Sequence, residues 1–220
     1  MILQANGIDI FYERLGEGRP FLLLHGNGED HSRFSALAPI LAQDFEVFAL
    51  DTRCHGKSST SATLGYLEMM EDVAAFISVL ALEKPLLLGA SDGGITGILL
   101  AIRYPEMLSG LIACGANTHF SQLRRWFILL TKLGYLTKKD PKLRLMLTEP
   151  NISHDEMARI KTPVLVLAGT RDIVSTHTTR EIAQAIPGSE LKILEGETHD
   201  SYLVHHERLL EAIKPFLTRI

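Results

Sequence analysis

Short apolar runs alternate with stretches of helical spacing along most of this 220-residue chain. Residues 8–12 alternate apolar and polar side chains, as a half-exposed strand does. Strand-like runs that are mostly apolar follow at 21–24, 47–50, 86–88, 111–113, 164–168 and 191–194. Runs of this kind are typical of strands that are covered on both faces. The alternation therefore predicts an α/β fold, a mostly parallel, doubly wound sheet with helices on both sides.

The stretches between these runs carry apolar residues at helical spacing. Residues 73–80 and 95–102 each have one apolar stripe at i, i+3, i+4 and i+7, which predicts helices that dock on the sheet. The Pro-Gly pair at 187–188 ends a third helix. A last helix is expected from about His206, and Pro215 within it predicts a kink or an early end.

One segment, residues 118–159, shows no strand pattern and holds the only tryptophan, Trp126. We interpret it as one or two helices inserted between strands, forming a short helical cap on a single domain that spans 1–220. Four apolar residues at helical spacing are expected to pack beneath this cap, although some of them could line an acyl site: Leu123, Phe127, Leu130 and Leu133.

Charge within the chain is uneven. Residues 118–148 contain seven Lys and Arg against one Asp, a net charge of +6, while the total for the chain is −4. Such a basic segment could attract an acidic substrate or partner. We favour the simpler interpretation that its charges face solvent or rest on the acidic remainder of the chain.

Composition excludes several classes of protein. The negative net charge provides no basic field for nucleic acid, and the apolar runs are far shorter than the ~20 residues of a membrane span. We therefore expect neither a nucleic-acid nor a membrane partner. The first residues lack the pattern of a secretion signal, and Cys54 and Cys114 lie in unlike contexts, which favours a cytoplasmic protein with reduced thiols. The oligomeric state is open.

The sharpest motif is G-x-S-x-G at residues 89–93, between a predicted strand and a predicted helix. A tight strand-to-helix turn exposes a serine hydroxyl near the first N–H groups of the helix, and small residues on either side prevent a collision between the two elements. An idle Ser in a glycine-rich turn is the alternative. The flanking strand and helix favour Ser91 as a nucleophile.

A serine nucleophile needs a base and a carboxylate that orients it, which follow it in the order Ser, acid, His. Asp172 comes directly after the run 164–168, and His199 follows the run 191–194. We predict that His199 takes the proton of Ser91 and that Asp172 holds the imidazole. The competing interpretations are a helix-capping acid for Asp172 and a surface histidine for His199.

Acyl transfer also needs N–H donors for the oxyanion. We predict the backbone N–H of Asp92, which follows the nucleophile, and that of Asn27, in the loop after the run 21–24. His25 in the same loop is expected to be structural. Trp126 and Phe127 of the cap are candidate substrate contacts.

These motifs resemble the α/β-hydrolase superfamily over nearly the whole chain. The segments that carry the likeness are FLLLHGNG, DTRCHGKSS, LLLGASDGGITG, GTRD and GETH. LLLGASDGGITG is most similar to the group of biphenyl-hydrolase-like serine esterases that includes valacyclovir hydrolase, and to small bacterial esterases. Cys54 stands where this family has Gly, which bears on a turn. The resemblance implies that Asp92 receives a substrate amino group; a helix-start acid favoured by the helix dipole is the simpler alternative, and the one we prefer.

Together these features predict a serine hydrolase that cleaves a small ester through an acyl-enzyme on Ser91. Carbon–carbon bond hydrolysis and amino-acyl ester hydrolysis on the same triad are the alternatives within enzymes, and a catalytically weak, hydrolase-like binding protein is the alternative outside them. The histidines show no paired metal-ligand spacing and no nucleotide fingerprint is complete, so we expect no metal and no cofactor.

Overall fold

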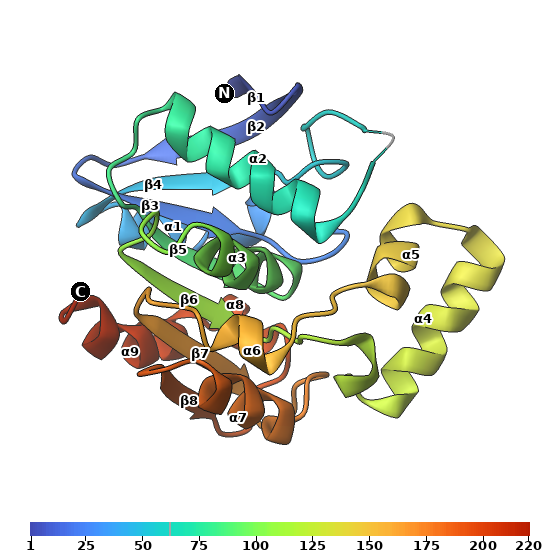
Figure 1. Ribbon diagram of the computed structural model, residues 1–220. Helices are drawn as coiled ribbons and strands as arrows, with labels where there is room; N and C mark the ends of the chain where they lie inside the picture. Colours follow the sequence, from blue (N-terminus) through green and yellow to red (C-terminus); the bar gives the residue numbers. More distant parts are fainter. Residues whose placement is uncertain (62) are drawn as a thin grey trace.

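A single sheet forms the centre of the computed structural model, which describes residues 1–61 and 63–220 (Figure 1). Its eight strands in the described part lie in the order β1-β2-β4-β3-β5-β6-β7-β8. Every neighbouring pair from β4–β3 to β7–β8 is parallel, and the pairs β1–β2 and β2–β4 are antiparallel. The strands are β1 (Ile2–Ala5), β2 (Ile8–Leu15), β3 (Arg19–Leu24), β4 (Phe45–Leu50), β5 (Leu86–Ala90), β6 (Gly110–Cys114), β7 (Val164–Gly169) and β8 (Glu190–Leu194). The mostly parallel, doubly wound sheet predicted from the sequence is confirmed.

Helices cover both faces of this sheet because successive strand residues point to opposite sides. In β3, Leu22 and Leu24 join one buried cluster, and Phe21 and Leu23 join the other. The first cluster is covered by α2 (Tyr66–Val79), α3 (Asp92–Arg103), α6 (His154–Met157) and α7 (Thr176–Ala185), and the second by η1 (His31–Phe34), α1 (Ala38–Leu41), α8 (Ser201–Val204) and α9 (His206–Leu217). None of the described helices has the length and apolar content needed to cross a bilayer.

Two elements differ from the sequence-based expectation. Strand β1 was not predicted, because its four residues are too few to show a period and it pairs only with β2 at the sheet edge. Helix α9 does not end early at Pro215 but continues to Leu217.

The chain between β6 and β7 contains η2 (Phe120–Gln122), α4 (Arg125–Lys138) and α5 (Pro141–Thr148). We call α4 and α5 together the α4–α5 hairpin. In Figure 1 it projects from the side of the molecule, away from the sheet. Thr131 is the only buried residue that the described part of α4 contributes, and Leu145 the only one of α5. The hairpin therefore adds little to the two main cores.

The apolar stripe expected beneath this segment is only partly buried. Leu123 is buried and Phe127 packs against it in a small cluster with Val174. Leu130 and Leu133, however, are 59% and 50% exposed, so the expectation that they pack inward is wrong. Their spacing indicates an apolar face of helix α4, but spacing alone does not show whether that face packs against another element.

Candidate active site

Ser91 lies in a sharp turn between β5 and α3. Its φ of +51° is in the left-handed region that side chains rarely adopt. The two glycines of the motif make this turn possible: a Cβ on Gly89 would lie 2.2 Å from the carbonyl oxygen of Gly93, and one on Gly93 would lie 2.2 Å from that of Leu24. Strand β5, helix α3 and strand β3 thus approach so closely that only glycine fits at either side of the serine.

Asp172 and His199 come from the loops that follow β7 and β8, at the same edge of the sheet as Ser91. The imidazole Nδ1 of His199 lies 2.6 Å from Oδ1 of Asp172. Asp172 is fully buried, and its Oδ1 also accepts a hydrogen bond of 2.9 Å from the backbone N–H of Val174. The fold therefore brings together two residues that the sequence predicted as partners across 27 positions.

The environment of His199 favours its role as a base. Burial lowers the pKa of His199, but the hydrogen bond to Asp172 and the charge of that carboxylate raise it by more, so the net pKa lies above the usual 6.5. Because Nδ1–H donates to Asp172, the other ring nitrogen, Nε2, remains as the basic atom. His199 and Ser91 line the same cavity.

Gly115, directly after β6, leaves the room that the His199 ring occupies. Its φ is +58°, and a Cβ there would lie 2.8 Å from Cε1 of His199 and 2.8 Å from the hydroxyl of Tyr202. That hydroxyl donates a 3.3 Å hydrogen bond to Oδ2 of Asp172. The sequence analysis missed both residues, since their function depends on contacts between loops. A Gly directly after a buried strand was the one available signal for Gly115.

The loop after β3 passes beside Ser91. A Cβ on Gly26 would lie 3.2 Å from Cβ of Ser91, so the backbone of this loop and the serine side chain are in contact range. Among the described residues, neither the backbone N–H of Asn27 nor that of Asp92 donates a hydrogen bond. In the described part of the chain, the N–H of Asp92, which follows Ser91, and that of Asn27, which follows Gly26, thus have no acceptor, as the predicted oxyanion site requires.

Both carboxylate oxygens of Asp92 already accept hydrogen bonds from protein side chains. It is 2% exposed, its Oδ1 accepts a 2.8 Å hydrogen bond from the hydroxyl of Tyr66, and its Oδ2 accepts one of 2.9 Å from the side-chain amide of Asn27. Burial raises the pKa of Asp92 to about 6, against the lowering effect of the two hydrogen bonds. This geometry favours a structural link between α2, α3 and the loop after β3 over the capture of an amino group.

The same Asn27 amide reaches the α4–α5 hairpin. Its Nδ2 lies 3.3 Å from the backbone oxygen of Lys142 in α5. One side chain therefore connects the loop beside Ser91 both to helix α3 and to the hairpin.

A cavity of about 420 Å³ opens between these elements. Ser91, His199 and Asn27 lie on its polar side. Its apolar wall is formed mainly by residues of the hairpin and of α8: Trp126, Phe127, Leu130, Leu143, Met146 and Leu203. The two predicted substrate contacts, Trp126 and Phe127, both border it. Glu29 and Asp200 also border it and were not predicted, because neither belongs to a recognisable motif.

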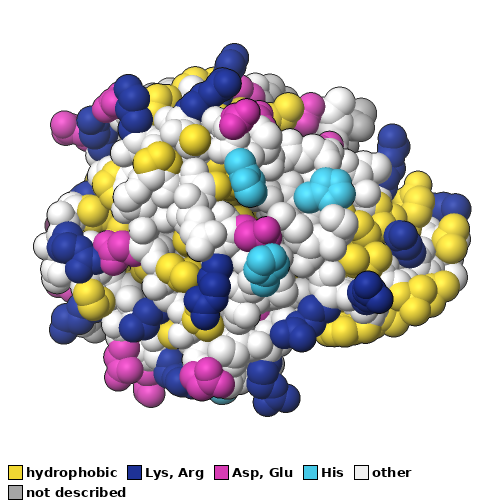
Figure 2. All heavy atoms as spheres, turned by 60° about the horizontal axis from the view of Figure 1, so that its bottom comes forward, with side chains coloured by type: hydrophobic (Ala, Val, Ile, Leu, Met, Phe, Trp, Pro, Cys, Tyr) yellow, Lys and Arg dark blue, Asp and Glu magenta, His cyan; other side chains and the backbone are white. Residues whose placement is uncertain are grey.

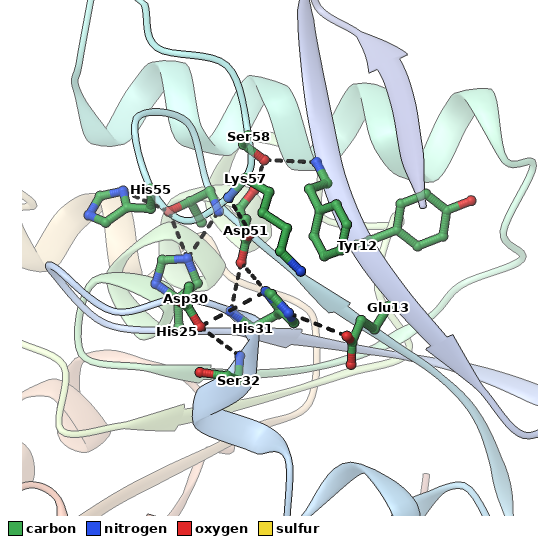
Figure 3. A network of polar contacts seen from close by, with 12 residues as sticks. Tyr12, Glu13, His25, Asp30, His31, Ser32, Asp51, His55, Lys57 and Ser58 are labelled. Atoms are coloured by element: carbon green, nitrogen blue, oxygen red, sulfur yellow. Dashed lines mark hydrogen bonds and ion pairs between the residues drawn. The ribbon is translucent and has the colours of Figure 1, made fainter.

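A second polar cluster connects the loop after β3 to the loop after β4 (Figure 3). Nδ1 of His25 lies 2.8 Å from the backbone oxygen of Gly26, and its Nε2 accepts a 3.0 Å hydrogen bond from the N–H of Thr52. Both ring nitrogens are thus engaged, in agreement with the predicted structural role of His25. Burial lowers the pKa of His25, which keeps the ring neutral.

Asp51 links the segment that follows β3 to the segment that follows β4. Its Oδ1 accepts hydrogen bonds of 2.6 and 2.7 Å from the backbone N–H and ring Nδ1 of His31, and its Oδ2 accepts one of 2.7 Å from the N–H of Lys57 (Figure 3). Asp30, His31 and Asp51 place potential metal-ligand atoms within 4.8 Å of one another, a grouping that the spacing of the histidines did not predict. Because both oxygens of Asp51 are occupied by these donors, we interpret the group as a brace between loops.

Cys54 lies in the turn that follows β4. Its φ is +62°, in the left-handed region where glycine is favoured. This agrees with the expectation that the replacement of Gly by Cys54 concerns a turn.

Comparison with known proteins gives a consistent result. A family model described as alpha/beta hydrolase fold matches residues 19–153. The chain is 24% identical to a pimeloyl-[acyl-carrier protein] methyl ester esterase of Aeromonas hydrophila, over 96% of this chain and 100% of that protein. It is 25% identical to the serine hydrolase BPHL of Mus musculus, over 97% of this chain and 84% of that one. Among solved structures, an enol-lactonase from Burkholderia xenovorans LB400 superposes with a TM-score of 0.84 at 21% identity, covering 99% of this chain and 100% of the enol-lactonase.

Proposed function

Because the chain belongs to the α/β-hydrolase fold family, we propose that it is a serine hydrolase that cleaves a small carboxylic ester through an acyl-enzyme on Ser91. The observation that carries this proposal is the 2.6 Å hydrogen bond between His199 and the fully buried Asp172, in a cavity that Ser91 also lines. The family match ends at residue 153, so this pair supports the proposal independently of it.

In the proposed reaction, Oγ of Ser91 attacks the ester carbonyl while Nε2 of His199 takes its proton. Asp172 stabilises the imidazolium through Nδ1. The N–H groups of Asn27 and Asp92 stabilise the negative charge on the carbonyl oxygen. His199 then returns the proton to the leaving alcohol, and a water molecule activated by His199 hydrolyses the acyl-enzyme by the reverse steps.

The shape and lining of the cavity set the proposed substrate class. A volume of about 420 Å³ with apolar walls fits a compact acyl or aromatic group. Hydrolysis of an amino-acyl ester is disfavoured, because both oxygens of Asp92 already accept hydrogen bonds. Carbon–carbon bond hydrolysis would use the same three residues, and rates on vinylogous diketones and on activated esters of equal size distinguish the two reactions.

A fluorophosphonate probe tests the proposal directly. We expect stoichiometric labelling of the wild-type protein and none of Ser91→Ala. Ser35→Ala, which removes an exposed serine outside the motif, is the matched control and should label like the wild type. Folded wild-type protein that takes up no probe would favour the hydrolase-like binding protein. A series of esters of graded acyl size and charge, with Ser91→Ala as the blank, then defines the substrate class.

A further inference from the structure

Helix α4 carries an unusually exposed apolar stripe. Five large side chains lie along it at positions i, i+3, i+4, i+7 and i+10. Each of them is between 50% and 63% exposed: Trp126, Leu129, Leu130, Leu133 and Leu136. Residues at this spacing lie on one side of a helix. A soluble monomer rarely leaves such a continuous apolar row in water without a partner.

Only part of the stripe lies away from the cavity: Leu129, Leu133 and Leu136 do not line it, whereas Trp126 and Leu130 do. Phe127 and Ile128, on the other side of α4, pack into the small cluster with Val174, and Thr131 on that side is buried. Figure 1 shows α4 at the outer edge of the molecule. In Figure 2, hydrophobic side chains cover the projecting part of the surface at the right, with Lys and Arg side chains among them.

Charge identifies the kind of partner. The segment 118–148 has a net charge of +6, with Arg125 and Lys132 exposed on α4 and Lys138 and Lys139 exposed at its end. A helix with Trp and Leu on one face and Lys and Arg beside them is typical of helices that lie on anionic lipid surfaces. Two copies of this chain that met symmetrically through α4 would bring together two positively charged segments.

We propose that the outer face of α4 docks on an anionic lipid surface, with its apolar stripe inserted among the headgroups. The sequence analysis expected no membrane partner because no apolar run is long enough to span a bilayer. A helix that lies on a bilayer is a different arrangement and needs only one apolar face. Trp126 and Leu130 belong both to the stripe and to the wall of the cavity, so docking brings the mouth of the cavity to the lipid.

The test is co-sedimentation of the full chain with lipid vesicles. We expect binding to phosphatidylcholine vesicles that contain about 30% phosphatidylglycerol, little binding to phosphatidylcholine alone, and a loss of binding as salt is raised from about 0.1 M to about 1 M. The double variant Leu129→Glu/Leu136→Glu removes apolar side chains that do not line the cavity. It should lower the partition coefficient about tenfold or more.

The matched control is Leu67→Glu/Val79→Glu on α2, whose two side chains are similarly exposed, at 59% and 56%. It should bind vesicles as the wild type does, and all three proteins should take up the fluorophosphonate probe equally. The proposal is overturned if the wild type does not sediment with anionic vesicles, or if both double variants bind equally well. A dimer in sedimentation equilibrium that only the α4 variant dissociates would also overturn it and assign the stripe to a second copy.

Discussion

The sheet edge that carries Ser91, Asp172 and His199 and the hairpin that faces it are built in different ways. At the sheet edge, carboxylates are buried and hydrogen-bonded. Glycines there let neighbouring backbone segments pack so closely that a Cβ atom would overlap them. The hairpin buries one residue on each of its helices and exposes five large apolar side chains, all of them on α4. The proposed chemistry thus depends on the core of the protein, whereas substrate selection depends on an element that the core does not need.

The largest effect is expected for Asp172→Asn, on the sheet side. It should lower kcat/KM for an ester by roughly a thousandfold to ten-thousandfold, because an amide cannot stabilise the imidazolium or hold its tautomer. Catalysis needs neutral His199, whose pKa Asp172 raises, so the acid limb of the kcat/KM profile should move to lower pH. Hydrolysis rates across about pH 5 to 9 measure both effects. Asp44→Asn, an exposed carboxylate, is the control, and an unmoved acid limb would contradict the role of Asp172.

The second prediction compares one helical glycine from each region. Gly93→Ala should lower the free energy of unfolding by about 3 kcal/mol, because its methyl group would meet the backbone of Leu24 at 2.2 Å. Gly134→Ala in α4 meets only the end of the Leu143 side chain, at 3.1 Å, and should change stability by less than about 1 kcal/mol. Urea denaturation measures both. Equal losses would show that the two regions are packed alike.

Asp92 gives a prediction on pH. Its folded pKa of about 6 lies above the ordinary 3.8, so the stability that the neutral carboxyl contributes is complete below about pH 4 and is lost as pH rises through 6. The stability of Asp92→Asn relative to the wild type should therefore rise by roughly 2–3 kcal/mol between about pH 4 and pH 7. Denaturation at several pH values tests this, with the exposed Asp9→Asn as a control that should show no such trend.

The smallest effect on stability is expected in the hairpin. Trp126 is 54% exposed and borders the cavity, so Trp126→Ala should change the free energy of unfolding by less than about 1 kcal/mol. It should nevertheless lower kcat/KM about tenfold for a bulky acyl ester and leave an acetyl ester almost unchanged. Trp126→Phe should recover part of the loss. Equal losses on both esters would mean that Trp126 does not select the acyl group.

The same difference between the regions explains what the sequence could predict. Strands buried on both faces leave apolar runs, and Asp172 and His199 follow such runs directly, so their convergence at one edge could be inferred from the order of elements. Period and strand order do not report contacts between side chains from separate loops. The two hydrogen bonds that link Tyr66, Asp92 and Asn27 could therefore not be predicted, although each residue lies next to a recognisable element.

In the hairpin, the apolar spacing of α4 could be recognised from the sequence, but which side of the helix is buried could not. Leu130 and Leu133 have the spacing of packed residues and are exposed, because they lie on a second apolar face of the helix that the described residues leave largely uncovered. Strand β1 was missed for a different reason, since four residues at an edge carry too little pattern to distinguish a strand from a loop.

The hydrogen bonds of the Asn27 amide limit how this protein can be re-engineered. A larger pocket obtained by shifting α5 would take the carbonyl of Lys142 away from Asn27, and the Asn27 amide would lose one of its two anchors. Libraries that aim at bulkier acyl groups therefore belong on α4, at Trp126 and Leu130, where side chains can be shortened while both anchors stay in place.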